Sequence, residues 1–201
     1  MKIGRFEYQG NIRYGLVAGE EVRFLKGGLF SAFQESWESV LLSHLKVLVP
    51  VLPSKIVCVG QSYREHIQEL GVPVPGKPVI FLNPPSSLVG PGQAILFPSG
   101  ATRVDYEGEL ALIVKEPMKA TPPEQALQFL LGVSCFNDVI ERSMAAKDPY
   151  LLTLAKGFDT FGSLGPYIAT DLDPDHLRAR TYLNGKLRQD DTTANCVFDA
   201  K

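Results

Sequence analysis

Short apolar runs separated by polar and turn residues open the chain. They fall at residues 3–8, 12–16 and 22–24, with Gly10-Asn11 and Gly19-Glu20 between them. Alternation of apolar and polar positions is typical of half-buried strands joined by tight turns. The pattern therefore predicts a three-stranded meander over residues 1–30.

The period of the pattern changes after residue 31. Apolar side chains then recur at three- and four-residue steps, at Phe33, Trp37, Val40, Leu41 and Leu45. This spacing predicts one amphipathic helix over 31–48, which Pro50 and Pro53 end. We expect residues 1–52 to form a small N-terminal domain of meander plus helix, and residues 53–201 to form a second unit.

The second unit is rich in predicted strands. They are expected at 55–59, 79–82, 94–97, 104–114 and 133–136, with a short helix at 62–70 and another from Thr121 to Gly132. Asn184-Gly185 between two apolar pairs is typical of a hairpin turn. Because the strands outnumber the helices at irregular intervals, we predict a β-rich α+β fold.

Composition excludes several classes of partner. Twenty basic and 22 acidic residues give a net charge of −2, with no basic stripe for nucleic acid. The apolar runs are too short to span a membrane, and residues 1–10 do not resemble a secretory leader. Three widely spaced cysteines, Cys58, Cys135 and Cys196, are expected to be reduced, buried thiols. These features favour a cytoplasmic protein that binds neither nucleic acid nor membrane.

Acidic residues two positions apart are the first candidate for chemistry. Asp105, Glu107 and Glu109 would lie in one row if residues 104–114 are extended. The row is either a solvated acidic face or a site for a hard cation such as Mg²⁺ or Mn²⁺. Asp138 follows a buried-looking strand and is either a further oxygen ligand or a cap of the next turn.

Three more residues are candidates for acid/base or charge chemistry. His66 and Glu69 lie three apart, so the carboxylate can raise the basicity of the imidazole, although a surface pair is the alternative. Lys156, in an otherwise apolar stretch, would suit an anionic oxygen or simply be solvated.

Taken together, these motifs resemble the fumarylacetoacetate hydrolase family, over residues 55 to 198. The matching segments are 55–60 with Ser62, Tyr63 and His66; 81–82 with Pro84; 104–110; 137–139 with Arg142; 156–161; 164–166; and Asn184-Gly185 with Arg188-Gln189. Their shared order makes the resemblance far more specific than any single motif.

The resemblance implies a mixed β-roll, a homodimer and a defined site. Mg²⁺ or Mn²⁺ would be held by Glu107, Glu109 and Asp138. His66 and Glu69 would act as acid and base on a lid, and Lys156 would stabilise an enolate. Tyr63, Arg142 and Asp159 would bind the substrate.

The family's reactions leave the activity open. We expect isomerisation of a 2-oxo or 2-hydroxydienoic dicarboxylate of aromatic catabolism, through a metal-chelated enolate. The alternatives are hydrolysis of a carbon–carbon bond in an acylpyruvate, decarboxylation of oxaloacetate, and a non-catalytic relative.

This chain departs from the family pattern at three places. It has Asn83 where a lysine is common, 143–145 read Ser-Met-Ala, and no Thr-Gly-Thr-Pro segment occurs before Lys201. We therefore expect the catalytic unit to be incomplete at its C-terminal end.

Overall fold

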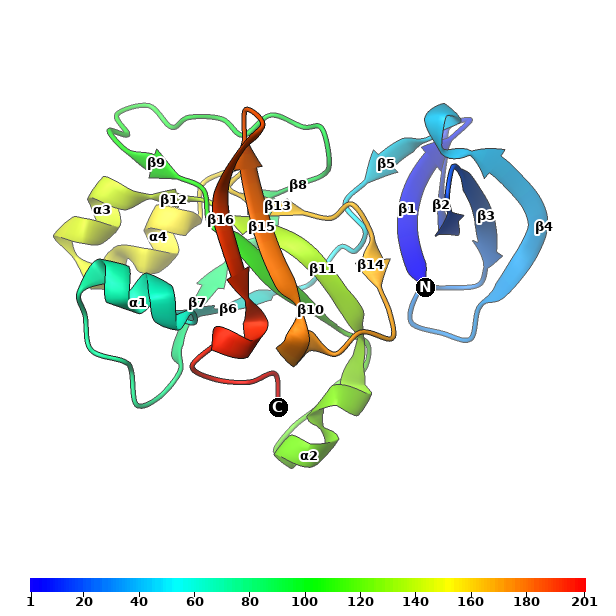
Figure 1. Cartoon of the computed structure of the whole chain (residues 1–201). Coiled ribbons are helices and arrows are strands. Elements are labelled where there is room, and N and C mark those ends of the chain that lie inside the picture. Colours follow the sequence, from blue (N-terminus) through cyan, green and yellow to red (C-terminus); the bar gives the residue numbers. More distant parts are fainter.

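The computed structural model describes residues 1–201, except for the side chain of Pro149. Its largest element is a ten-stranded sheet in the order β4-β3-β2-β1-β14-β11-β13-β8, with β5 against β1 and β10 against β11 (Figure 1). Only the pairing of β13 with β8 is parallel, so the sheet is mixed. Its strands are β1 (Lys2–Tyr8), β2 (Asn11–Ala18), β3 (Glu21–Lys26), β4 (Gln34–Leu41), β5 (Lys46–Leu48), β8 (Leu88–Val89), β10 (Gly108–Val114), β11 (Leu130–Asp138), β13 (Gly162–Leu164) and β14 (Ile168–Ala169).

Three strand pairs and four short helices complete the fold. The pairs are β6 (Ile56–Gly60) with β7 (Val79–Asn83), β9 (Val104–Asp105) with β12 (Ile140–Glu141), and β15 (Arg178–Leu183) with β16 (Lys186–Thr192). The helices are α1 (Arg64–Leu70), α2 (Pro123–Ala126), α3 (Arg142–Lys147) and α4 (Leu152–Lys156). Strands dominate, which confirms the β-rich α+β class. Among the described helices, none has the length and apolarity needed to cross a membrane.

The predicted meander and hairpin are both present. Strands β1, β2 and β3 pair antiparallel in sequence order, and Phe6, Val22 and Phe24 are fully buried between them. The hairpin β15–β16 turns at Asn184 and Gly185, with φ of 52° and 73°. Positive φ at both turn positions is what made this dipeptide predictive.

The helix predicted over 31–48 is wrong. The segment forms β4, a single 3₁₀ turn over Leu42–His44, and β5. Strand β4 pairs with β3, where the Arg23 side chain forms an ion pair with Glu35. Trp37, expected on the buried helical face, is fully exposed at 101%. Pairing with a neighbouring strand therefore overrides an apolar spacing that only resembles a helix.

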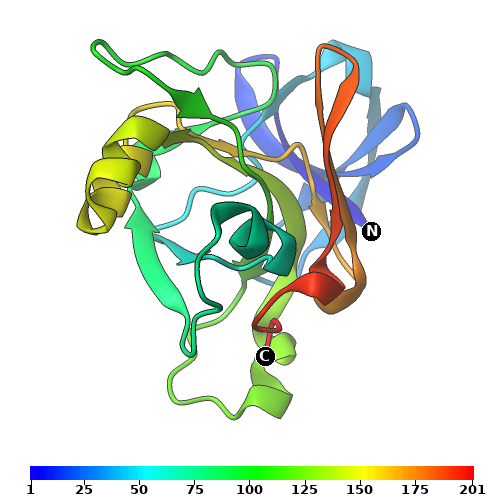
Figure 2. The same cartoon turned by 60° about the vertical axis from the view of Figure 1, so that its left-hand side comes forward.

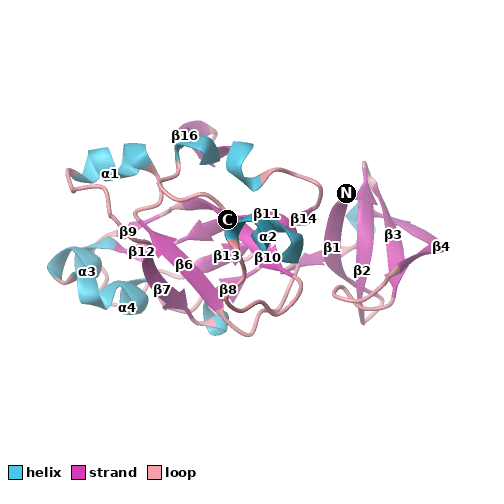
Figure 3. Cartoon of the chain, turned by 90° about the horizontal axis from the view of Figure 1, so that it is seen from below, coloured by secondary structure: helices cyan, strands magenta, loops and turns pink.

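The N-terminal meander is continuous with the rest of the molecule. Lys2 and Ile3 of β1 pair with Ala169 and Ile168 of β14, which pairs in turn with β11. Ile3 and Ile168 share one core cluster with Phe136 of β11. Seen from below, the meander forms one end of an elongated molecule (Figure 3). The division at residue 52 stays a prediction.

Two predicted strands need correction. The run 104–114 is broken into β9 and β10, because β9 pairs with β12 whereas β10 pairs with β11. Glu107 lies at this change of partner. The strand expected at 94–97 is wrong: the segment is irregular and exposed, and its Leu96 amide donates a hydrogen bond to Thr160 Oγ1.

Gly132 does not end a helix, as the sequence suggested. Helix α2 is one turn long, and Gly132 lies within β11. A Cβ atom added at this position would overlap the backbone carbonyl oxygen of Ala169 on β14. The glycine is therefore required by the close approach of two strands.

Gly132→Ala is expected to lower the free energy of unfolding by about 1 to 3 kcal/mol, because backbone must move to admit the methyl group. Urea denaturation measures the change. Gly76→Ala is the matched control, since a Cβ there meets nothing within 4 Å. Equal stabilities of the two variants would contradict the close approach.

Candidate active site

Three carboxylates meet where β10 begins and β11 ends. Glu109 is paired across the strands with Phe136, two residues before Asp138. Cross-strand partners and residues two apart share a face of the sheet, so Glu109 and Asp138 lie on the same side. The amide of Asp138 donates a hydrogen bond of 2.9 Å to the carbonyl oxygen of Glu107. The change of strand partner at Glu107 thus brings all three carboxylates together.

Lys156, the last residue of α4, lies among these carboxylates with its side chain only 4% exposed. Its Nζ donates to Glu107 Oε2 at 2.6 Å, to Asp138 Oδ2 at 2.7 Å and to the Asp138 carbonyl at 2.8 Å. An ammonium group has three N–H donors, so all of them are used. The lysine is therefore not a solvated surface residue.

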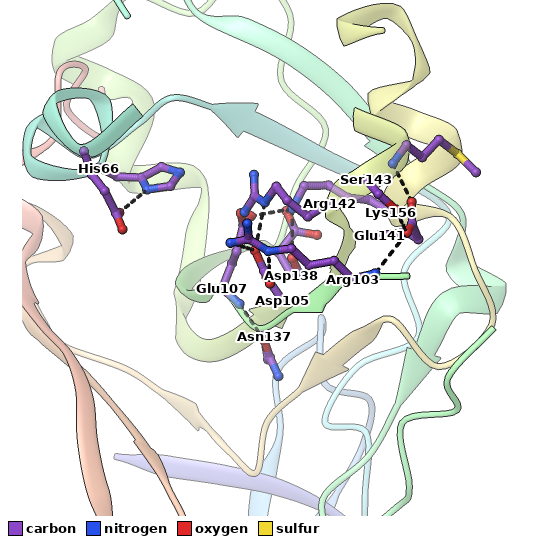
Figure 4. Close-up of polar contacts among 12 residues, drawn as sticks. His66, Arg103, Asp105, Glu107, Asn137, Asp138, Glu141, Arg142, Ser143 and Lys156 are labelled. Carbon is purple, nitrogen blue, oxygen red and sulfur yellow. Dashed lines mark hydrogen bonds and ion pairs between the residues drawn. The ribbon is translucent and has the colours of Figure 1, made fainter. Parts of the chain in front are cut away.

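Arg142 extends the cluster toward the surface. Its Nε donates to Asp105 Oδ2 at 3.0 Å, and its Nη2 is in contact with Glu107 Oε1 (Figure 4). Glu107 is consequently shared between Arg142 and Lys156. The side chain of Glu141, 4% exposed overall, accepts hydrogen bonds from Ser143 and the Met144 amide and so fixes the start of α3, where Arg142 lies.

The cluster contains one more carboxyl group than cations. Four carboxyl groups, those of Asp105, Glu107, Glu109 and Asp138, face three cations, Lys156, Arg142 and Arg103. Burial, and then the charges of Glu107 and Asp138, raise the pKa of Glu109 to about 8. Burial also raises the pKa of Asp138, against the lowering effect of Lys156. The carboxyl group without a cation partner is that of Glu109, which Lys156 does not bond in the described structure.

Asn83 belongs to this site, although the sequence indicated only a missing positive charge. The residue is 2% exposed, and its Nδ2 donates to Asp138 Oδ1 at 2.6 Å. Its Oδ1 is buried and has no hydrogen-bond partner among the described residues. Asn83 thus orients Asp138 and leaves a buried acceptor free at the end of β7.

A cavity of about 1020 Å³ opens on the carboxylates, between β6, β10 and the C-terminal segment. Glu109, Asp138 and Tyr63 line it, as do Cys58 and Cys196. Burial, and then the charge of Glu109, raise the pKa of the Tyr63 hydroxyl above its usual range. The cavity could hold a small molecule with its polar end at the carboxylates.

The cysteines are free, as predicted, but not uniformly buried. Cys135 is exposed, and Cys58 and Cys196 are partly buried. Burial, and then the charge of Glu109, raise the pKa of Cys196 to about 11. Burial and the charge of Asp138 raise the pKa of Cys58 in the same direction. Protonated thiols are poor metal ligands, so the oxygen atoms remain the stronger donors at this site.

The remaining predicted site residues lie outside the carboxylate cluster. His66 Nδ1 is 3.1 Å from Glu69 Oε2, and both side chains are on the exposed side of α1. Figure 2 shows α1 across the open side of the curved wall of strands, and Figure 4 shows His66 apart from the cluster. Asp159 is exposed in the turn after α4, and no described residue forms a hydrogen bond or ion pair with it. The roles of these residues stay predictions.

The chemistry of the donor set fits a divalent cation. Glu107, Glu109 and Asp138 supply the hard oxygen atoms that Mg²⁺ and Mn²⁺ prefer. The raised pKa of Glu109 and the free Asn83 Oδ1 mark a carboxyl group without a cation partner and an unused acceptor in the same region. As they lie in the described structure, no three His, Cys, Asp or Glu side chains are grouped closely enough to hold an ion. Cation binding therefore requires these side chains to adjust.

The family model for the fumarylacetoacetate (FAA) hydrolase C-terminal region matches residues 55–201, and an Rv2993c-like N-terminal model matches residues 1–50. The first match covers most of the chain, so the chain belongs to the fumarylacetoacetate hydrolase family. The expected resemblance and the fold of this family are confirmed.

Individual relatives cover nearly all of this chain. An uncharacterized protein of Archaeoglobus fulgidus is 42% identical over 98% of this chain and 75% of its own length. The crystal structure of 2-hydroxyhepta-2,4-diene-1,7-dioate isomerase from Mycobacterium marinum is 34% identical, with a TM-score of 0.89 over 99% of this chain and 77% of that one. The mitochondrial oxaloacetate tautomerase fahd2 of Xenopus laevis is 36% identical over 84% of this chain and 54% of its own length.

Proposed function

We propose that this protein is a divalent-metal-dependent isomerase of a small 2-oxo or 2-hydroxydienoic dicarboxylate. The observation that carries the proposal is that Glu107 and Asp138 meet at Lys156 while Asp138 and Glu109 line a cavity. Likeness to the M. marinum isomerase supports a 2-hydroxydienoic diacid as the substrate class. The homodimer and the cytoplasmic location stay predictions.

The proposed roles follow from charge and position. Glu107, Glu109 and Asp138 would hold Mg²⁺ or Mn²⁺, which when bound supplies Lewis-acid polarisation of the substrate's 2-oxygen. Lys156 would add positive charge beside that oxygen, because its ammonium is fixed and dehydrated. Tyr63, from the cavity wall, and Asp159 would position the substrate.

Proton transfer would be carried out by His66, with Glu69, on helix α1. Glu69 holds the His66 imidazole by one nitrogen and leaves the other nitrogen for a substrate carbon. For a 2-hydroxydiene, the 2-hydroxyl would lose its proton and the imidazole would deliver a proton to a carbon further along the chain, which gives a 2-oxo-ene. Arg142 would contribute its unused Nη1 edge to the nearer substrate carboxylate, since Nε and Nη2 are engaged.

A second candidate is keto–enol conversion or cleavage of a 2-oxo diacid such as oxaloacetate. Likeness to the X. laevis oxaloacetate tautomerase favours it. The same site would serve, because both reactions build negative charge on a 2-oxygen. The isomerisation moves a proton along the chain, keto–enol conversion moves one between the 2-oxygen and the adjacent carbon, and cleavage breaks a carbon–carbon bond.

Turnover of 2-hydroxyhepta-2,4-diene-1,7-dioate, oxaloacetate and an acylpyruvate separates these possibilities. We expect conversion of at least one compound with Mg²⁺ or Mn²⁺, and loss of that conversion after chelation with EDTA. Ultraviolet absorbance follows the diene, and pyruvate or CO₂ release reports cleavage. No turnover from well-folded, metal-supplemented protein would contradict the proposal and favour a non-catalytic relative.

A further inference from the structure

Arg103 lies at the outer end of the charged cluster, beyond Asp105. Its Nε donates to Asp105 Oδ1 at 3.0 Å, and its Nη2 is 2.9 Å from Asp105 Oδ2. Arg142 Nε is 3.0 Å from the same Oδ2 atom. Two guanidinium groups therefore lie side by side on one carboxylate, as Figure 4 shows.

One carboxylate cannot neutralise two guanidinium groups. Arg142 has a second anionic partner in Glu107, whereas Asp105 is the one described partner of the Arg103 side chain. The Arg103 side chain is 67% exposed, compared with 21% for Arg142. Arg103 is thus the more accessible guanidinium of the pair, on the solvent side of the cluster.

The backbone of Arg103 is held from both sides. Its carbonyl accepts a 2.8 Å hydrogen bond from the Arg142 amide, and its own amide points at Glu141 Oε1. The hydrogen bonds to Asp105 and its charge raise the pKa of Arg103, and the charge of Glu69 on α1 adds to this effect. The backbone contacts fix Arg103 beside the start of α3, at the outer end of the cluster.

An accessible arginine with one free N–H edge is suited to an anionic ligand. Asp105 uses the Nε and one Nη2 donor of Arg103, so the Nη1 edge is free among the described contacts. A planar guanidinium fork binds carboxylates with defined geometry, which favours a carboxylate over a diffuse counter-ion. Arg142 also has a free Nη1 edge, but its side chain is less accessible, at 21% exposed, and is held by two carboxylates, Asp105 and Glu107.

We propose that Arg103 is a specificity-determining residue that binds the far carboxylate of a dicarboxylate substrate. This inference rests on the proposed function, in which the 2-oxo acid end lies at Glu109 and Asp138. Arg103 then decides between diacids and monoacids, and Asp105 positions both arginines. The 2-oxo acid end of the site and the position of Arg103 are joined by a chain of contacts. It runs through Asn83, Asp138, Lys156, Glu107, Arg142, Asp105 and Arg103.

Matched ligands test this role by calorimetry in the presence of Mg²⁺. The ligands are 2-oxo diacids of five to seven carbon atoms, each compared with the 2-oxo monoacid of the same length. We expect Arg103→Ala to weaken binding of at least one diacid about tenfold and to leave its monoacid unchanged, as for the loss of one charge-assisted contact. Arg103→Lys keeps the charge without the fork, so an intermediate loss is expected.

Arg23→Ala is the matched control, because Arg23 is an exposed arginine that forms an ion pair with Glu35 in the meander. It should change neither affinity. Thermal unfolding of each variant checks that the fold is kept. Equal weakening of diacid and monoacid in Arg103→Ala, or no weakening, overturns the role of Arg103 alone. Failure of the wild-type protein to bind any of these ligands contradicts the 2-oxo acid function, and the inference with it.

Discussion

Lys156→Met is expected to lower the free energy of unfolding by about 3 to 5 kcal/mol. Methionine has a similar length but carries no charge, so Glu107 and Asp138 lose the ammonium group that faces them in a buried site. Removing one member of a buried ion pair costs more than the pair itself contributes, because the other charges stay buried. Denaturation in urea, monitored by circular dichroism, measures the change, and the variant should also lose turnover.

Lys46→Met is the matched control for this experiment. Lys46 Nζ lies 3.0 Å from Glu7 Oε2, so the distance resembles that of the Lys156 pairs, but the lysine side chain is 70% exposed. An exposed pair contributes about 0 to 1 kcal/mol, and the variant should remain close to wild type. A similar loss in both variants would show that burial does not set the strength of the Lys156 contacts.

Glu109→Gln is expected to weaken Mg²⁺ binding by about 100-fold or more, because an amide oxygen replaces a charged ligand. The same change should raise the stability of the metal-free protein by about 1 kcal/mol, because it removes a carboxyl that burial and like charges disfavour. Calorimetry with MgCl₂ and thermal unfolding in EDTA measure the two effects.

A loss of Mg²⁺ affinity together with a gain in stability would show that Glu109 is a metal ligand and not a structural residue. Glu35→Gln, in an exposed pair with Arg23 of the meander, is the control and should alter neither metal affinity nor stability appreciably. Unchanged Mg²⁺ affinity in Glu109→Gln would remove this residue from the proposed metal site. Glu107 is a less suitable target, because it also forms ion pairs with Lys156 and Arg142.

The parts of the fold that depend on local chemistry could be predicted from the sequence. Asn184-Gly185 defines its own turn through positive φ, and the alternation in β1 to β3 reports burial on one face. The segment 31–48 could not be predicted in this way, because its period fits a helix whereas its hydrogen bonds go to β3 and β1. Gly132 was misleading for a similar reason, since its requirement comes from β14.

In the candidate site, too, features set by local sequence could be predicted, whereas features set by distant contacts could not. The acidic residues stand out in the sequence because their spacing of two residues is visible, and the structure brings Glu107 and Asp138 together with Lys156. The part played by Asn83 could not be found, because Asp138 lies 55 residues further along the chain. Arg103 gave no signal either, since one arginine among exposed residues is ordinary in a sequence. Contacts between distant segments decide these roles.

The pairing of β1 with β14 limits how this protein could be recombined with its relatives. Strand β11 carries Asp138 at one end, and its Val133 is paired with β14, so the meander and the site share one hydrogen-bonded frame. A meander taken from another protein would have to reproduce the register of Lys2 and Ile3 and fill the volume that Ile3 occupies in the core. Strands β1 and β14 are therefore expected to vary together among relatives. A chimeric protein should fold only when both of these strands come from the same parent.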